Sequence, residues 1–400
     1  MGMNRSTTSL LGAVCTVTLF AVTMGSVPQA QAPAAPAPAA PAAGRGGGGA
    51  APQQDACGGR SNQPQVPCAQ DVTRMMAVLP ERAPATPARP RKILVLAATS
   101  GFVHSSIPLA AKMVEEMGKK TGAWTTDITY NRAAITPANL AQYDAIFLDS
   151  TTGTFLDEPN PFNDPAVQAV TDARRKALLD FVRGGKGLAG IHAATDSYHG
   201  RAGGAGRGAA AAAPAAAPAA PAAAAAPAAA GRGAQAPCTS NQTQGAAAGG
   251  DPLWPEFNKM IGGYFKFHWN YPTAITVKID DPSNPINAAF KGQPFNAIDE
   301  VYTFAWNSFS RDNVRVLTSV DYSTLSPCDK GLESNMRPDN DYALSWIKRE
   351  GQGRVFYQAL GHHEGIYYNH PQMLEHILAG IQYALGDLKA DDTPRPRGAK

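Results

Sequence analysis

Four histidines follow apolar stretches at positions where a strand would end: His104, His192, His268 and His362. In an open α/β sheet, ligands bind outside the carboxyl ends of the strands. Imidazole can bind a metal or move a proton near neutral pH. Because the chain has only 8 histidines, this placement predicts a site at the rim of a sheet, with these four side chains as candidate ligands of a divalent metal.

Two carboxylates accompany these histidines. Asp196 follows His192 in the segment 190–196 (GIHAATD), where it could orient the imidazole. The alternative for His192 is a structural histidine packed under a loop. Glu300, in the segment 298–304 (IDEVYTF), is a candidate general acid or base, and the alternative is a solvated acid. The predicted catalytic residues are therefore His192, Asp196, Glu300 and His362.

The neighbours of the histidines refine this prediction. Adjacent side chains on an extended chain point to opposite sides, so His362 and His363 should not share one site, and we favour His362. The aromatic segment 262–269 (GGYFKFHW) could form a sugar-stacking wall or part of the core, and His268 could serve the site or the structure. His104 precedes a predicted helix start, which favours neutral imidazole and suits a metal ligand. We expect the remaining histidines to lie in loops or on helix surfaces; they are His199, His370 and His376.

Several familiar signatures are missing from the sequence. No GxGxxG follows the first predicted strand, and there is no P-loop, HExxH or GxSxG motif. Readings as a dinucleotide oxidoreductase, a phosphoryl transferase, a zincin or an α/β-hydrolase lose their main support. We expect no nucleotide cofactor.

Strands and helices that could position these residues alternate along the chain. Predicted strands cover 92–98, 124–130, 145–148 and 187–191, with helices opening at Pro108 and at Asp164-Pro165 between them. This alternation predicts a parallel sheet with helices on both faces. A β-rich part follows, with strands at 273–279, 301–304 and 314–320, a hairpin over 343–358, and helices at 255–261 and 371–385.

Other segments cannot build a core. Residues 1–32 read as a signal peptide, which predicts an exported, periplasmic or extracellular protein without a membrane span in the mature chain. Residues 33–90 are predicted to be a disordered linker, 201–250 a low-complexity insert, and 389–400 a disordered tail. One domain over 91–388 remains. The net charge of +3, carried by scattered Lys and Arg, indicates no nucleic-acid partner.

Export would permit disulfides among the four cysteines after the signal peptide. Cys57 and Cys68 could close a local loop, and Cys238 and Cys328 could then tie the insert to a later loop. Four unpaired thiols are the alternative.

The chain resembles the trehalose-utilisation (ThuA-like) family. The matching segments are 92–96 (KILVL), 101–108 (GFVHSSIP), 190–196 (GIHAATD), 262–268 (GGYFKFH), 299–304 (DEVYTF), 353–362 (GRVFYQALGH) and 380–386 (GIQYALG). The resemblance implies a flavodoxin-like fold, similar to class I glutamine amidotransferases. Those enzymes carry a nucleophilic cysteine after a central strand. Here the turn at 190–193 holds His192 and no cysteine, which excludes thiolate amidotransfer at that position.

The resemblance also implies a sugar-related role, tied to trehalose or 3-keto-glycosides. We therefore expect an exported sugar hydrolase or lyase that acts on a small carbohydrate at a histidine-lined, metal-dependent site. The alternative is a non-catalytic carbohydrate-binding protein on a degenerate amidotransferase fold, which predicts histidines too far apart to share a ligand.

Overall fold

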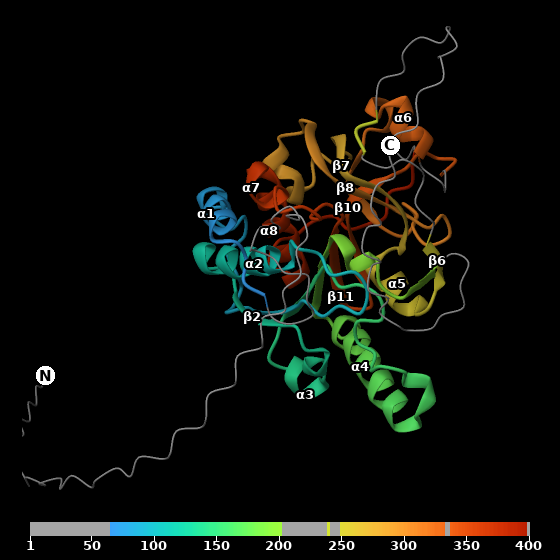
Figure 1. Cartoon of the computed structure of the whole chain (residues 1–400). Coiled ribbons are helices and arrows are strands. Elements are labelled where there is room, and N and C mark those ends of the chain that lie inside the picture. The colour runs from blue at the N-terminus through green and yellow to red at the C-terminus, as the bar shows by residue number, and fades with distance from the viewer. Residues whose placement is uncertain (1–64, 202–237, 241–248, 333–336, 398–400) are drawn as a thin grey trace, which may run out of the picture. The chain divides into compact units, whose positions relative to one another are not determined.

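A computed structural model describes residues 65–201, 238–240, 249–332 and 337–397 (Figure 1). The helices are α1 Ala69–Val78, α2 Ile107–Thr121, α3 Pro137–Leu140, α4 Pro165–Arg183, α5 Pro255–Ile261, α6 Pro327–Leu332, α7 Ile366–Asn369 and α8 Pro371–Leu385. The strands are β1 Lys92–Leu96, β2 Thr125–Thr129, β3 Ala145–Asp149, β4 Gly187–Ile191, β5 His199–Arg201, β6 Gly249–Pro252, β7 Phe265–Ile279, β8 Phe295–Phe304, β9 Arg315–Val320, β10 Ala343–Glu350 and β11 Gly353–Gln358. Short 3₁₀ segments are η1 Arg132–Ala134, η2 Pro161–Asn163, η3 His192–Thr195, η4 Pro285–Phe290 and η5 Tyr322–Thr324.

Nine of these strands form one mixed sheet in the order β2-β1-β3-β4-β11-β10-β9-β7-β8. The first five are parallel to one another, and β10, β9, β7 and β8 continue the sheet with antiparallel pairing. The predicted fold class, a flavodoxin-like parallel sheet with an added β-rich portion, is confirmed. Parallel strands place their carboxyl ends at one edge, so residues that follow β1, β4 and β11 can meet there.

Helices cover both faces of the central strands. Every residue of β3 and β4 is buried, as expected for strands between two helical layers. Two glycines let the layers approach closely: a Cβ on Gly187 would lie 2.5 Å from the carbonyl oxygen of Ala384 in α8, and one on Gly353 would lie 2.1 Å from that of Val182 in α4. Figure 1 shows α3 and α4 on one side, away from α1, α2 and α7.

The helix boundaries follow the predicted signals. Helix α8 spans the predicted range and ends at Gly386, which has φ +79°. Helix α4 begins after Asp164, whose side chain accepts a hydrogen bond from the backbone N–H of Ala166. No helix among the described residues is long and apolar enough to cross a membrane.

The predicted linker and tail differ from the structure. Helix α1 lies inside the segment expected to be disordered and buries Met75 against the core, because its apolar side chains recur at helical spacing. The tail is fixed by ion pairs, of which Arg315 with Asp391 is one. The predicted signal peptide, the linker before residue 65 and most of the insert lie outside the described residues.

One of the two candidate disulfides joins Cys238 to Cys328, with their Cα atoms 4.9 Å apart. Cys68 is disulfide-bonded as well, whereas Cys57 lies outside the described residues. Next to the first bridge, the backbone N–H groups of Thr239 and Ser240 donate to the carboxylate of buried Asp329. Residues 238–240 of the insert are therefore bound to α6 by covalent and polar contacts.

His376, predicted to lie on a helix surface, is instead fully buried in the core face of α8. Its Nδ1 donates to the carbonyl of Ile286, so Nε2 accepts from the hydroxyl of Ser345. Burial lowers the pKa of His376 to about 4, although the hydrogen bond to Ile286 opposes this shift.

We therefore expect protonation of His376 to destabilise the fold. The imidazole has a pKa of about 6.5 when unfolded, so the unfolded state binds more protons between pH 6.5 and pH 4 and stability falls as pH falls through this window. The expected loss is roughly 3 kcal/mol. It is measured by urea unfolding of the wild type and His376→Gln at several pH values. If the free energy of unfolding depends on pH in the same way in both proteins, protonation of His376 is not the cause of the loss.

Candidate metal centre

Three of the four predicted histidines meet at the carboxyl edge of the parallel strands. His104 lies between β1 and α2, His192 directly follows β4, and His362 follows β11. His104 and His192 are buried, and the side chain of His362 is 23% exposed. These three residues, which lie 88 and 170 positions apart along the chain, are thus brought together at the edge expected from the strand ends.

The backbone at His192 adopts a left-handed conformation, with φ +45°. A non-glycine residue there is strained, and such strain is common at functional sites. The ring is fixed because Nδ1 lies 2.8 Å from the carbonyl oxygen of Ala359 and must donate to it. The Nε2 atom of His192 therefore carries a lone pair directed away from that carbonyl, which is the arrangement that metal-binding histidines use.

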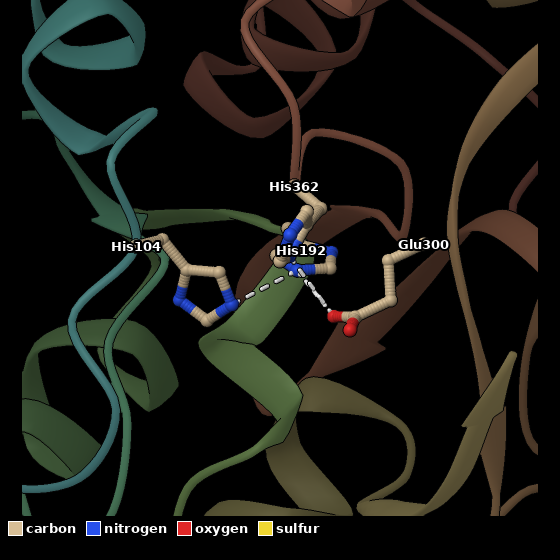
Figure 2. A group of neighbouring side chains, drawn as sticks. All are labelled: His104, His192, Glu300 and His362. Carbon is tan, nitrogen blue, oxygen red and sulfur yellow. Dashed lines mark hydrogen bonds and ion pairs between the residues drawn. The ribbon is translucent and has the colours of Figure 1, made fainter. Parts of the chain in front are cut away.

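A carboxylate completes the group. Nε2 of His192 lies 3.2 Å from Nε2 of His104 and 3.4 Å from Oε2 of Glu300. Nδ1 of His362 lies 3.1 Å from the same Oε2. Figure 2 shows His104 and Glu300 pointing toward His192 from opposite sides. One ligand atom from each of the four residues lies within 4.8 Å of the others.

The three separations of 3.1, 3.2 and 3.4 Å fit the spacing of ligands around one ion. With metal–ligand bonds of about 2.0–2.2 Å, neighbouring ligands lie about 2.9–3.5 Å apart. The donor set of three imidazoles and one carboxylate suits Zn²⁺, Mn²⁺ or Fe²⁺. The facing nitrogens of His104 and His192 support the same interpretation, because without an ion one of them must carry a proton toward the other. We refer to His104, His192, Glu300 and His362 as the histidine–glutamate group.

Glu300 occupies the position that the sequence assigned to His268. The sequence predicts that His268 follows the end of a strand. In the structure it lies inside the long strand β7. There it pairs with Tyr302 of β8, and its Nδ1 lies 3.1 Å from Oε1 of Glu300. The two carboxylate oxygens of Glu300 thus face different partners: Oε2 faces His192 and His362, and Oε1 faces His268.

The charges of the group are coupled. Burial alone would raise the pKa of Glu300, but the close contacts of its carboxylate with His192, His268 and His362 hold this pKa well below its usual range. Burial opposes charge on His362, yet its close contact with the charged Glu300 outweighs this effect and raises the pKa of His362. The site therefore keeps a carboxylate at neutral pH, and a metal that binds there would displace protons.

Asp299, the residue before Glu300, holds the loop that carries His362. Its fully buried carboxylate accepts hydrogen bonds from the backbone N–H groups of Gly361, His362 and His363, at 2.6, 3.3 and 3.0 Å. Burial raises the pKa of Asp299, although these donors and two histidines oppose the shift. Neighbouring residues on β8 point to opposite sides, so Glu300 faces the histidines while Asp299 fixes the backbone of one of them.

His363 lies outside the group, as predicted. Its ring stacks on Tyr271 with 4.3 Å between centroids, and its side chain is 39% exposed.

The predicted pairing of Asp196 with His192 is wrong. The Asp196 carboxylate lies 2.5 Å from Nε2 of His199, while the carbonyl of Ala359 orients His192. His199, expected in a loop, begins β5 and has only 10% of its side chain exposed. The i, i+3 spacing of Asp196 and His199 in a turn is the signal that could have indicated this pair.

We expect His268→Ala to weaken metal binding only moderately. His268 contacts a ligand rather than the ion, and the loss of such a contact typically costs about 10–100-fold in affinity. Isothermal titration calorimetry with Zn²⁺ or Mn²⁺ measures the change. Complete loss of binding in this variant would show that His268 is itself a ligand.

Comparisons with known proteins agree with the resemblance seen in the sequence. The family model ThuA, described as trehalose utilisation, matches residues 92–239 and 243–384. No curated protein matches the chain. A solved structure of a protein described as ThuA-like, from Bacteroides uniformis ATCC 8492, is 18% identical and aligns with 75% of this chain and 94% of that chain, with a TM-score of 0.45. A second, from Parabacteroides merdae ATCC 43184, is 15% identical and aligns with 75% and 92%, with a TM-score of 0.42.

Proposed function

The chain belongs to the trehalose-utilisation (ThuA) family, and from this premise we propose that it is an exported, metal-dependent enzyme that acts on a small keto-sugar. The observation that carries the proposal is the histidine–glutamate group, whose ligand atoms lie within 4.8 Å of one another at the carboxyl edge of the sheet. A divalent ion held there would act as a Lewis acid toward a carbonyl oxygen or a water molecule.

The residues around the group can prepare it for this role. Asp299 and the Ala359 carbonyl orient two of the histidines, so little reorganisation is needed when a ligand binds. Burial of His104, His192 and Glu300 limits water around the group, which strengthens electrostatic interactions with a bound carbonyl.

An exposed aromatic side chain beside the group supports a sugar as substrate. Phe102 is 47% exposed, and its ring lies 4.8 Å from that of His104 in an edge-on arrangement. Aromatic rings in binding sites offer a rigid apolar surface, and the apolar face of a sugar ring can pack on such a surface. Export remains part of the proposal, supported by the apolar segment and small-residue ending within residues 1–32.

The alternative, a carbohydrate-binding protein without catalysis, predicts histidines too far apart to share a ligand. Ligand atoms of three histidines and Glu300 instead lie within 4.8 Å of one another. The geometry therefore favours the metal-dependent enzyme, a hydrolase or lyase.

The proposal is tested on the purified protein in two steps. Elemental analysis and calorimetry with Zn²⁺, Mn²⁺ and Fe²⁺ measure metal binding, and turnover of 3-keto-glycosides is then followed with and without a chelator. We expect one ion per chain and activity that the chelator removes and added metal restores. A protein that binds none of these ions, or whose turnover is the same with chelator, would refute the proposal.

A further inference from the structure

Asp196 and His199 form a second polar pair near the histidine–glutamate group. Nε2 of His199 lies 2.5 Å from Oδ1 of Asp196, and Nδ1 lies 2.8 Å from the carbonyl oxygen of Gly200. Both ring nitrogens thus face oxygen acceptors. Neutral imidazole has a single N–H, so this geometry suits the doubly protonated ring, which would pair with an ionised Asp196.

The surroundings of His199 are consistent with a charged ring. Burial alone would lower the pKa of His199, but the hydrogen bond and charge of Asp196 raise it, against a smaller opposing effect of Lys266 on β7. The ring packs against Tyr264 and Phe265, with centroids 6.2 and 5.4 Å apart.

Short aromatic contacts connect this pair to the histidine–glutamate group. The Phe265 ring lies 4.8 Å from that of Tyr302, and the Tyr302 ring lies 4.4 Å from that of His192. Asp196 also directly follows η3, the turn that begins with His192. Two aromatic rings in succession, those of Phe265 and Tyr302, thus connect His199 to His192 of the histidine–glutamate group.

Asp196 keeps one oxygen for other partners. Its side chain is 23% exposed, and Oδ2 accepts no hydrogen bond from the residues that the structure describes. The backbone around it is fixed, because its N–H donates to Ala193 and its carbonyl accepts from Gly153. A rigid, partly exposed carboxylate with one free oxygen can accept a proton from a bound molecule.

We propose that Asp196 is the general base of this site, that it takes a proton from the carbon next to the carbonyl of a keto-sugar, and that His199 is its positioning residue. This inference rests on the proposed function. It adds the class of reaction, proton abstraction from carbon, and therefore favours a lyase over a hydrolase.

The proposed step is balanced within the site and the substrate. The C–H bond next to the carbonyl breaks, its proton forms an O–H bond with Oδ2 of Asp196, and its electron pair enters the carbonyl group to give an enolate. Return of a proton to that carbon restores the ketone. In D₂O the acid on Asp196 exchanges with solvent, so the returning particle is a deuteron and the substrate acquires one deuterium.

The experiment follows this exchange by ¹H NMR, with methyl 3-keto-glucoside as the probe and metal-loaded protein in D₂O. We expect the wild type to exchange the proton next to the carbonyl and Asp196→Asn to exchange it at least about 100-fold more slowly, the usual effect of losing a general base. The matched control is Asp339→Asn, which changes a carboxylate of similar exposure that pairs with Arg337 and is not a member of the group. It should exchange at the wild-type rate.

The positioning role of His199 is tested by His199→Gln. Glutamine can still donate a hydrogen bond to Asp196 but cannot carry a charge. We expect about 10-fold slower exchange and an acid limb of the pH–rate profile that moves to higher pH, because the carboxylate loses its cationic neighbour. A purely structural role for His199 would leave the profile in place.

Two further measurements separate the possible failures. Calorimetric metal affinity should be the same in Asp196→Asn and the wild type, and NMR of the metal-free protein should show that the His199 ring titrates at lower pH once Asp196 is replaced. If the wild type binds metal but exchanges no proton, or if Asp196→Asn exchanges normally, this inference is wrong and the metal site stands. If the wild type binds no metal, the proposed metal-dependent function itself is wrong.

Discussion

His192→Ala is expected to lower the affinity for a divalent metal by more than about 100-fold, because the loss of a neighbour of a metal ligand alone costs about 10–100-fold. His192 contributes the nitrogen that lies near both His104 and Glu300, at 3.2 and 3.4 Å. The Ala359 carbonyl fixes its ring orientation, so that Nε2 is the atom that faces the group and is lost in the variant. Calorimetry with Zn²⁺ and Mn²⁺ measures the change, and turnover should fall with metal content.

The matched control for this variant is His363→Ala. His363 lies in the same loop as His362, but its ring stacks on Tyr271 outside the group. We expect wild-type metal affinity for this control. Equal affinity in His192→Ala and the wild type would place any bound metal elsewhere in the protein.

Asp299→Ala is expected to reduce the free energy of unfolding by about 3–5 kcal/mol, since the lost partner of one buried donor costs about 1–3 kcal/mol and that of each of two partly buried donors about 1 kcal/mol. The substitution removes the acceptor of three backbone N–H groups, those of Gly361, His362 and His363. Because the loop also carries a metal ligand, metal affinity should fall together with stability. Urea unfolding of the metal-free protein measures the loss of stability without the contribution of metal binding.

Asp321→Ala serves as the control for Asp299→Ala. Asp321 also accepts a backbone N–H, that of Ser323, but at an exposed position. The expected loss there is about 1 kcal/mol, typical of an exposed cap. If Asp299→Ala loses no more free energy of unfolding than Asp321→Ala, water or other groups must accept hydrogen bonds from the backbone N–H groups of the loop.

The order of the strands explains which site residues could be predicted. Apolar runs such as 92–96 and 187–191 mark strands buried on both faces, and the edge where such strands end is fixed by the parallel arrangement. A histidine that follows such a strand lies at this edge, which is why the sequence could predict that His104, His192 and His362 lie close together. A second local pattern separated His362 from His363: neighbouring side chains on an extended chain point to opposite sides.

The other residues depend on contacts that local patterns do not encode. Whether His268 or Glu300 faces the group is decided by the register of β7 and β8, which includes two irregular shifts. His199 lies in a strand whose partner β6 begins at the far end of the insert, so the burial of His199 could not be judged from its neighbours in the sequence. His376 is one polar residue on an apolar helix, and only its contacts with Ile286 and Ser345 show that the core accommodates it.

The positions of the four ligands along the chain have a consequence for stability. Glu300 comes from β8, at the opposite edge of the sheet from β2, whereas His104, His192 and His362 follow strands of the parallel half. An ion bound by all four residues would join the two halves of the sheet, much as a covalent cross-link does. Ligands that bind only the folded state stabilise it by about 4 kcal/mol when present at 1,000 times their dissociation constant. The thermal midpoint would then report ion binding in the absence of any substrate, and a chelator should loosen β8 before it unfolds the parallel strands.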